Sequence, residues 1–230
     1  MSETVVIHRR FRGPPDSGNG GYSAGMLARA LGGSGCAVTL LKPPPLGVAL
    51  RVESDGDEAR LLNGDEAIAS ARRARLDLDV PAPPGLAEAR EAERRFTGLA
   101  DHIFPGCFVC GPERPVGDGL RIFPGVVDGA VASTWQPSRD LAGEDGIVRP
   151  EFIWAALDCP GYFAVQAKAG LALLGRMTAV GHVPLRAEQD AIVTGWEIAS
   201  EGRKHEVGTA IHDEDGRLIA AARSTWITLR

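Results

Sequence analysis

The chain has 230 residues, 44% of them hydrophobic, and carries a formal net charge of −5. This length allows one large domain or two domains of about 100 to 120 residues. The negative charge argues against a face that binds nucleic acid, and no apolar run approaches the roughly 20 residues that a membrane span needs. We therefore expect neither nucleic acid nor a membrane as a partner, and a cytoplasmic location.

The first 80 residues predict one helix and a run of strands. A strand is expected at residues 5–12, and apolar residues at helical spacing predict a helix that follows the turn at Asn19 and stops at Gly32-Gly33. Asn63-Gly64 is a strong signal for a hairpin turn between two strands. The strands after the helix are expected at residues 37–41, 46–53, 59–62 and 67–78.

The proline-rich segment at residues 81–85 is the best domain boundary, because its prolines can neither continue a strand nor enter a helix. We therefore divide the chain into a first domain (1–80), a linker with a short helix at 86–95 (81–103) and a second domain (104–230). The second domain should contain a helix around Phe152, which Pro160 distorts beside Asp158. Its strands are expected at residues 120–123, 130–136, 173–180, 191–199, 206–212 and 218–229.

Segments of the first half return in the second half in the same order. Residues 19–28 align with 149–158 (149 − 19 = 130), Pro45-Leu46 with Pro184-Leu185 (184 − 45 = 139), and 63–72 with 215–223 (223 − 72 = 151). The growing offset indicates longer loops in the second copy, since surface insertions cost little. The pattern predicts an α+β fold of two tandem copies, each an antiparallel sheet wrapped around a central helix.

One position breaks this repeat, because Asp158 stands where the first helix has Ala28. Burying a carboxylate costs several kcal/mol unless something pairs with it or uses it, so Asp158 is a candidate site residue. Two other interpretations are a side chain exposed by the Pro160 distortion and a buried partner of an arginine. The glycines Gly20 and Gly21 at the start of the first helix can likewise serve only to shape a turn.

This arrangement resembles the double-hotdog form of the acyl-CoA thioesterase superfamily over nearly the whole chain. Many hotdog thioesterases begin their helix with His-Gly-Gly, followed by a short apolar run and an Asp or Glu. The first helix start, Asn19-Gly20-Gly21, keeps the glycines but lacks the acid. The second, Arg149 to Asp158, lacks the glycines but keeps an acid nine positions after its first residue (158 − 149 = 9), about the spacing between the His and the acid in the family. The loop at residues 104–112, with two cysteines, also resembles the lead-in to the first strand of some single-hotdog members.

The resemblance implies that the acid of one copy faces the helix start of the other. Asp158 would then face Gly20 and Gly21 and act as nucleophile or general base, with the glycine amides stabilising the oxyanion. The second pocket would pair Ala28 with Glu151 and be inactive. The implied substrate is an acyl-CoA or another pantetheine thioester, and no cofactor is expected. The candidate substrate-contacting residues are Asn19, Tyr22, Trp154 and Glu151, with a helix cap as the alternative for Asn19 and core packing for Trp154.

Other functions remain open. Asn19 stands where the family prefers His, which keeps open a non-catalytic protein that binds acyl or CoA esters. A hotdog hydratase or dehydratase is disfavoured because Asp140 and Asp145 lack the His which that chemistry requires. A Ser-His-Asp hydrolase is disfavoured because no Gly-x-Ser-x-Gly occurs. A double hotdog satisfies internally the pairing of single hotdogs, so a homodimer of double hotdogs is allowed but not required.

The four cysteines, Cys36, Cys107, Cys110 and Cys159, are too few and too scattered for a disulfide framework. Cys107-x-x-Cys110 can suggest zinc or redox chemistry, with His102 or Cys159 as further ligands. A structural zinc site usually takes four ligands from two such pairs, and only one pair is present. We therefore expect a pair of loop thiols and no metal.

Overall fold

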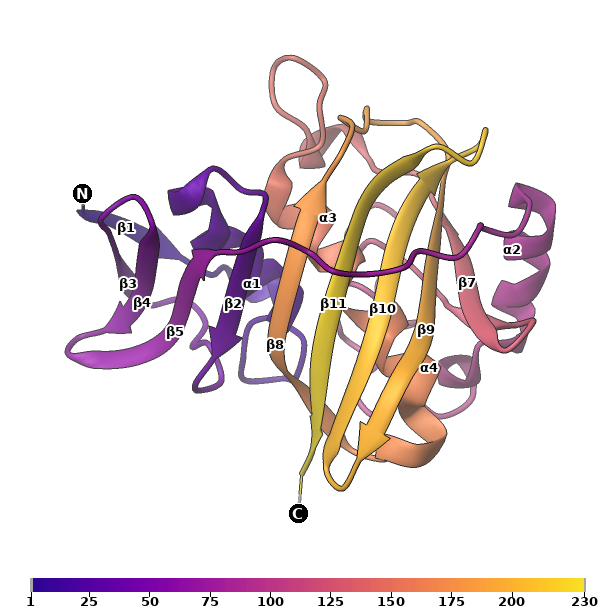
Figure 1. The fold of residues 1–230 in the computed structure, drawn as a ribbon, viewed down its shortest axis with the longest axis horizontal. Coiled ribbons are helices and arrows are strands. Elements are labelled where there is room, and N and C mark those ends of the chain that lie inside the picture. The colour runs from indigo at the N-terminus through magenta and orange to yellow at the C-terminus, as the bar shows by residue number, and fades with distance from the viewer. Residues whose placement is uncertain (1, 230) are drawn as a thin grey trace.

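An eleven-stranded antiparallel sheet forms the framework of residues 2–229, the part of the chain that the computed structural model describes (Figure 1). Its strand order is β1-β3-β4-β5-β2-β8-β11-β10-β9-β7-β6. The strands are β1 (Ser2–Val6), β2 (Cys36–Leu40), β3 (Ala49–Ser54), β4 (Glu58–Asn63), β5 (Glu66–Arg73), β6 (Gly125–Val127), β7 (Ala130–Trp135), β8 (Ala172–Gly181), β9 (Ala191–Glu201), β10 (Lys204–Asp213) and β11 (Leu218–Thr228).

The sheet consists of two sequence halves joined edge to edge. The first five strands in the order come from the first 73 residues, and the last six from residue 125 onward. They meet where β2 pairs with β8, from Cys36 opposite Ala179 to Thr39 opposite Arg176. With a helix inside each half, the protein has the predicted α+β double-hotdog fold.

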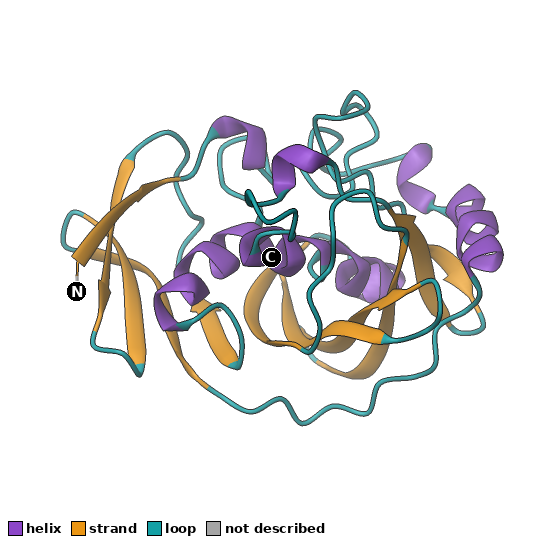
Figure 2. Cartoon of the chain, turned by 90° about the horizontal axis from the view of Figure 1, so that it is seen from above, coloured by secondary structure: helices purple, strands orange, loops and turns teal. Residues whose placement is uncertain are grey.

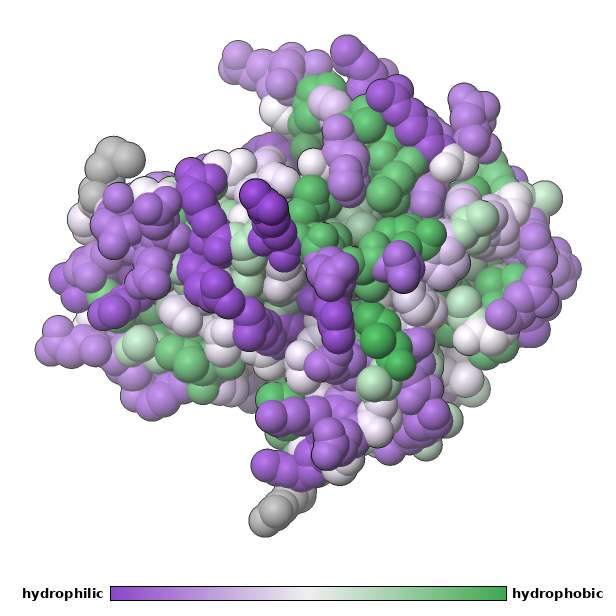
Figure 3. Space-filling model, in the orientation of Figure 1, coloured by the Kyte–Doolittle hydropathy of each residue, from purple (hydrophilic) through white to green (hydrophobic). Residues whose placement is uncertain are grey.

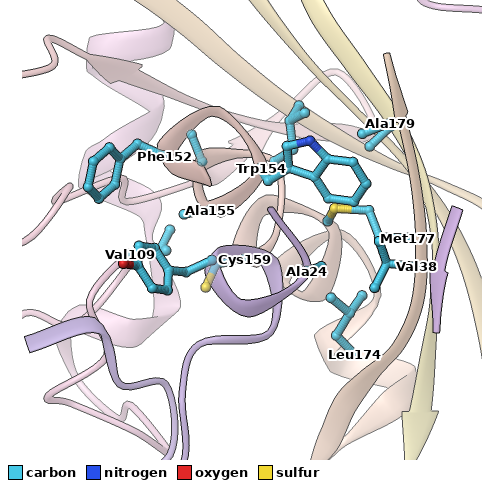
Figure 4. Packing of buried hydrophobic residues seen from close by; sticks show 14 of the residues in the cluster. Ala24, Val38, Val109, Phe152, Trp154, Ala155, Cys159, Leu174, Met177 and Ala179 are labelled. Atoms are coloured by element: carbon cyan, nitrogen blue, oxygen red, sulfur yellow. The ribbon is translucent and has the colours of Figure 1, made fainter. Parts of the chain in front are cut away.

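Helices cover one face of the sheet, as the view from above shows (Figure 2). They are α1 (Gly20–Ala28) in the first half, and α3 (Pro150–Ala156) and α4 (Cys159–Ala169) in the second. α1 and α3 pack directly against each other, with Ala24 and Ala155 fully buried. Figure 4 shows Trp154 of α3 beside Met177 of β8, next to Val38 of β2. The two halves therefore share one core as well as one sheet. None of the helices in residues 2–229 is long and apolar enough to cross a bilayer.

The loops that lead into α1 and α3 fold in the same way. The Asn19 amide donates to Phe11 O (2.8 Å), and 130 positions later the Arg149 amide donates to Leu141 O (3.0 Å). Each loop also contains a 3-10 turn, Arg9–Phe11 in the first and Arg139–Leu141 in the second. The alignment at an offset of 130 therefore holds at the level of backbone hydrogen bonds.

Two predicted strands are wrong in their bounds. The strand expected at 5–12 ends at Val6, because the 3-10 turn follows. The strand expected at 120–123 is a loop, since Arg121 has a left-handed backbone (φ 54°) that strand geometry excludes. β6 at Gly125–Val127 pairs with β7 in its place. Leu120 and Ile122 are nevertheless buried, and their amides donate to Phe108 O (2.8 Å) and Val109 O (3.0 Å) of the cysteine-containing loop.

A third predicted strand, at 67–78, is too long. β5 stops at Arg73, although the alternation of apolar and charged residues continues to residue 80. Leu76, Leu78 and Val80 are half-buried, and the charged residues between them are exposed. Figures 1 and 2 show this extended segment crossing the sheet face opposite the helices. Figure 3 shows patches of apolar residues among the charged ones on that face. The segment alternates like a strand but lies across the sheet, so it has no ladder to join. Beyond it, the expected helix at 86–95 is α2 (Leu86–Ala92) with a 3-10 turn at its end.

Candidate active site

Asp158 lies at a break between two helices. α3 ends at Ala156 and α4 begins at Cys159, with Asp158 between them. Pro160 lies in the first turn of α4, where its missing amide hydrogen is tolerated, but it prevents α3 from continuing undisturbed. The predicted distortion beside Asp158 is therefore present, and it turns the carboxyl group toward the first half of the chain.

The Asp158 carboxylate is bound by two donors from the start of α1. Its Oδ2 accepts hydrogen bonds from the Gly21 amide (3.0 Å) and from Asn19 Nδ2 (2.7 Å). The other oxygen, Oδ1, is buried and has no hydrogen-bond partner among residues 2–229. The structure thus brings the acid of the second half against the diglycine of the first, 137 residues away.

Asn19 and the glycines have distinct positions at the helix start. Asn19 caps α1, because its Oδ1 accepts from the Tyr22 amide (2.9 Å) while its Nδ2 holds Asp158. The Gly21 amide is occupied by Asp158, whereas the Gly20 amide meets no acceptor within the described part of the chain. Gly20 also borders a cavity, so the unpaired amide available to a ligand is that of Gly20.

The surroundings of Asp158 disfavour its ionised form. Burial raises the pKa of Asp158 to about 7, and charge on Cys107 acts in the same direction, while the hydrogen bonds from Gly21 and Asn19 lower the pKa. The side chain is 2% exposed, and no arginine pairs with it in residues 2–229. Both alternatives from the sequence, an exposed acid and an arginine-paired acid, are therefore wrong.

An apolar cavity of about 250 Å³ lies beside this group. Asp158, Asn19 and Gly20 border it, and most of the remaining wall is hydrophobic. Its volume is close to the lower end of the roughly 300–1,000 Å³ typical of small-molecule sites. Both halves contribute to the wall, which includes Leu40, Phe104, Tyr162, Phe163, Leu174 and Trp226.

Tyr22 and Trp154, two of the predicted substrate contacts, do not border this cavity. Tyr22 is stacked on Phe11, with ring centroids 4.2 Å apart, inside an aromatic cluster. Trp154 is buried, and its Nε1 donates to Gly33 O (3.0 Å). Both side chains are packed in the core, which is the alternative that the sequence left open for Trp154.

Glu151, the fourth predicted contact, is also absent from the cavity wall. It is 3% exposed, and its Oε1 forms ion pairs with Arg29 (3.5 Å) and Arg149 (3.6 Å), while Oε2 has no hydrogen-bond partner among residues 2–229. The expected pairing of Glu151 with Ala28 in a pocket is not found at either of the two cavities described for residues 2–229, because neither residue borders them.

A second cavity, of about 280 Å³, lies at the start of α3. Ile147, Val148 and Pro150 in its wall stand 130 positions after Ser17, Gly18 and Gly20, which border the first cavity. It therefore corresponds to the first cavity in the other half. Its wall contains no aspartate or glutamate, and Pro150 has no amide hydrogen at the helix start. The carboxylate and the free helix-start amide thus occur together at the first cavity.

A cluster of three thiols lies beside Asp158, where the sequence suggested Cys159 as a possible further ligand but predicted only a pair of loop thiols. The Sγ atoms of Cys107, Cys110 and Cys159 all lie within 4.8 Å of one another and are buried. Hydrogen bonds from the Cys110 and Cys159 thiols hold the pKa of Cys107 well below its usual range. The Cys107-x-x-Cys110 spacing shows only two of these thiols, because the third comes from the start of α4.

Comparisons with known proteins establish the fold. No family model and no curated protein matches the chain. The solved structures similar to it over 100% of its length include a tesB protein from Mycobacterium avium subspecies paratuberculosis (12% identity, TM-score 0.64, 93% of that chain). They also include a candidate thioesterase from Novosphingobium aromaticivorans (12%, 0.64, 96%) and a candidate thioesterase II from Thermobifida fusca (17%, 0.62, 92%). At these identities the similarity shows a shared fold.

Proposed function

We propose that the protein is a thioesterase that hydrolyses an acyl-CoA or another pantetheine thioester, with one active site at the interface of its two halves. The observation that carries this proposal is the Asp158 carboxylate, held through Oδ2 by Gly21 and Asn19 with Oδ1 unpaired. It borders an apolar cavity able to receive an acyl group. The full-length similarity to proteins described as thioesterases supports the same chemistry.

The chemistry assigns separate tasks to the two halves. The thioester carbonyl oxygen would approach the unpaired Gly20 amide, where the start of α1 favours the negative charge that develops on this oxygen. Oδ1 of Asp158 would attack the carbonyl carbon or take a proton from an attacking water. The C–S bond then breaks, and the thiolate leaves and takes up a proton. If Asp158 is the nucleophile, a water molecule then hydrolyses the acyl–Asp158 anhydride, which releases the carboxylic acid and restores the carboxylate. This assignment moves the oxyanion role from the Gly21 amide, which Asp158 already occupies, to Gly20.

Access to the carboxylate requires a movement. Asp158 is 2% exposed, so a substrate reaches Oδ1 only after side chains of the cavity wall shift. Binding of the acyl group in the cavity supplies contacts that can favour such a shift.

The test is a panel of acyl-CoA substrates of different chain length, with detection of the released thiol. Asp158→Asn keeps the shape of the side chain and should lower kcat/KM by at least about 100-fold, as expected for loss of a general base or nucleophile. Glu206→Gln is the matched control, because this partly exposed acid on β10 pairs with Arg223 outside the cavity. Equal rates for wild type and Asp158→Asn would remove the assigned role.

A second candidate function is a binding protein without catalysis. The deep burial of Asp158 and the amide of Asn19, where the resembling family prefers His, favour this alternative. Tight binding of a non-hydrolysable acyl-CoA thioether, together with no turnover of any thioester on the panel, would select it over the thioesterase.

The remaining expectations follow from this proposal. The expected substrate is an acyl-CoA or a related thioester, and nucleic acid and a membrane are not expected as partners. A cytoplasmic location and a homodimer of double hotdogs stay predictions, which fractionation of cells and a mass measurement in solution would check.

A further inference from the structure

Three thiols and one imidazole meet in the loop between α2 and β6 and at the start of α4. The Sγ atoms of Cys107, Cys110 and Cys159 lie within 4.8 Å of one another, and those of Cys107 and Cys159 are 3.8 Å apart. His102 Nε2 lies 3.3 Å from Cys110 Sγ. The three cysteines are buried and the imidazole is partly buried, so these groups face one another rather than the solvent.

The three thiols lie close enough together to hold one metal ion, and the His102 imidazole beside Cys110 is the candidate fourth ligand, which has to approach the other two thiols to complete the site. Zinc binds thiolate sulfur at about 2.3 Å and imidazole nitrogen at about 2.0–2.1 Å, so a tetrahedral site separates two sulfurs by about 3.8 Å, and sulfur from nitrogen by about 3.5 Å. The Cys107–Cys159 and His102–Cys110 separations, 3.8 and 3.3 Å, are close to these values. Thiolate and imidazole donors also favour zinc over magnesium or calcium.

We propose that Cys107, Cys110, Cys159 and His102 form a structural Zn²⁺ site. Four protein ligands close the coordination sphere, as in structural zinc sites. The metal would tie the loop at residues 102–110 to the first residue of α4, directly after Asp158. It would thereby fix the helix break that presents the carboxylate. The site does not depend on the proposed thioesterase activity.

Binding changes the protonation of the ligands. One Zn²⁺ displaces three protons, one from each thiol, and forms three Zn–S bonds. The Phe104 amide donates to His102 Nδ1 (3.0 Å), so the ring proton is on Nε2, which faces Cys110. Coordination through Nε2 moves this proton to Nδ1, and the contact with the Phe104 amide must open. His102 is therefore the weakest of the four ligands.

The wild-type protein provides the first test. The full chain, purified under a non-thiol reductant and without chelator, should contain about one zinc per chain by elemental mass spectrometry. Replacement of zinc by Co²⁺ should give thiolate-to-cobalt charge-transfer absorption and the intense visible bands of a tetrahedral ion. A chain that holds no zinc and takes up neither ion in titration would overturn the proposal. A Cys107–Cys159 disulfide as the only state of these thiols, found by peptide mass mapping, would overturn it as well.

Variants assign the ligands. Cys107→Ser and Cys159→Ser should each lower the zinc content at least tenfold, whereas Cys36→Ser, which removes a buried thiol of β2 outside the cluster, should keep it. His102→Ala should raise the Kd for zinc at least tenfold and leave the cobalt charge-transfer bands in place. Equal loss of zinc in Cys36→Ser and in the cluster variants would contradict the assignment. The cobalt spectrum of the wild type stays decisive if a variant fails to fold.

Discussion

At the scale of single residues, the site depends on an acid that is costly to bury. Asp158 has one oxygen with two donors and one with none among the described residues. A carboxylate in this position loses its hydration without full replacement. The protein therefore gives up stability at Asp158, a pattern typical of functional sites.

The first prediction is that removing this charge stabilises the fold. Asp158→Asn should raise the free energy of unfolding by about 1 to 3 kcal/mol at pH 8, because an amide is cheaper to bury than a partly satisfied carboxylate. Urea denaturation of both proteins measures the difference. A variant less stable than wild type would show that the carboxylate is a structural element of the helix break.

Asn19 serves both the helix and the acid, and substitutions can separate the two roles. Asn19→Ser should keep the cap of α1 and lose the bond to Asp158, whereas Asn19→Ala should lose both. We expect Ala to be less stable than Ser by about 1 kcal/mol, the usual value of a cap. Turnover should fall to a similar extent in both variants, because both lose the donor to Oδ2. Full turnover in Asn19→Ser would remove the role of Asn19 in positioning Asp158.

At the scale of elements, the glycines of α1 permit a close approach to α3. A Cβ on Gly21 would lie 2.5 Å from Trp154 O and 2.6 Å from Asp158 Cβ. A Cβ on Gly25 would lie 2.7 Å from the Cα of Glu151. Gly21 therefore does more than shape a turn. Together with Gly25 it leaves a helix surface without side chains, on which α3 packs.

This contact reverses the usual effect of alanine in a helix. Replacing an exposed glycine in a helix by alanine usually raises the free energy of unfolding by about 1 kcal/mol. Gly21→Ala and Gly25→Ala should instead each lower it by about 1 to 3 kcal/mol, because the added methyl groups overpack the contact with α3. Gly181→Ala is the control, since its Cβ would meet only Ser34 Oγ at 3.9 Å, an ordinary contact, and it has no left-handed backbone. Chemical denaturation should leave the control within about 0.5 kcal/mol of wild type. A neutral Gly25→Ala would mean that α1 and α3 can move apart at no cost.

The sequence predicted elements where the local pattern and the fold agree. The helix after Asn19 and the hairpin at Asn63-Gly64 were predicted, because a cap residue and a two-residue turn act locally. The alternation of apolar and charged residues at 74–80 led to a predicted strand that is too long. A half-buried extended segment shows the same alternation whether or not another strand pairs with it. For the thiols, the sequence suggested His102 and Cys159 as possible further ligands but favoured a plain pair of loop thiols, because Cys159 comes near Cys107 only through the tertiary fold.

At the scale of the whole molecule, the asymmetry of the halves determines where the chemistry lies. The first half supplies the open helix start, and the second supplies the acid at a helix break. The corresponding cavity of the second half has no acid in its wall, and Pro150 at its helix start has no amide hydrogen. The resemblance drew attention to the unequal helix starts, but the side-chain positions around the second cavity depend on packing that the sequence alone does not specify.

The last prediction concerns the linker, which connects the halves without being part of their interface. The halves are joined by the β2–β8 pairing and the packing of α1 on α3, and residues 74–85 run outside this contact (Figure 2). A protease site inserted after Ala82 should therefore be cut while both fragments stay together, since the buried core remains intact. The fragments should elute as one particle in gel filtration and keep any thioesterase activity of the uncut insertion variant, which is the control. Separation of the fragments under native conditions would show that the linker itself holds the halves together, and the division at residues 81–103 would then fail.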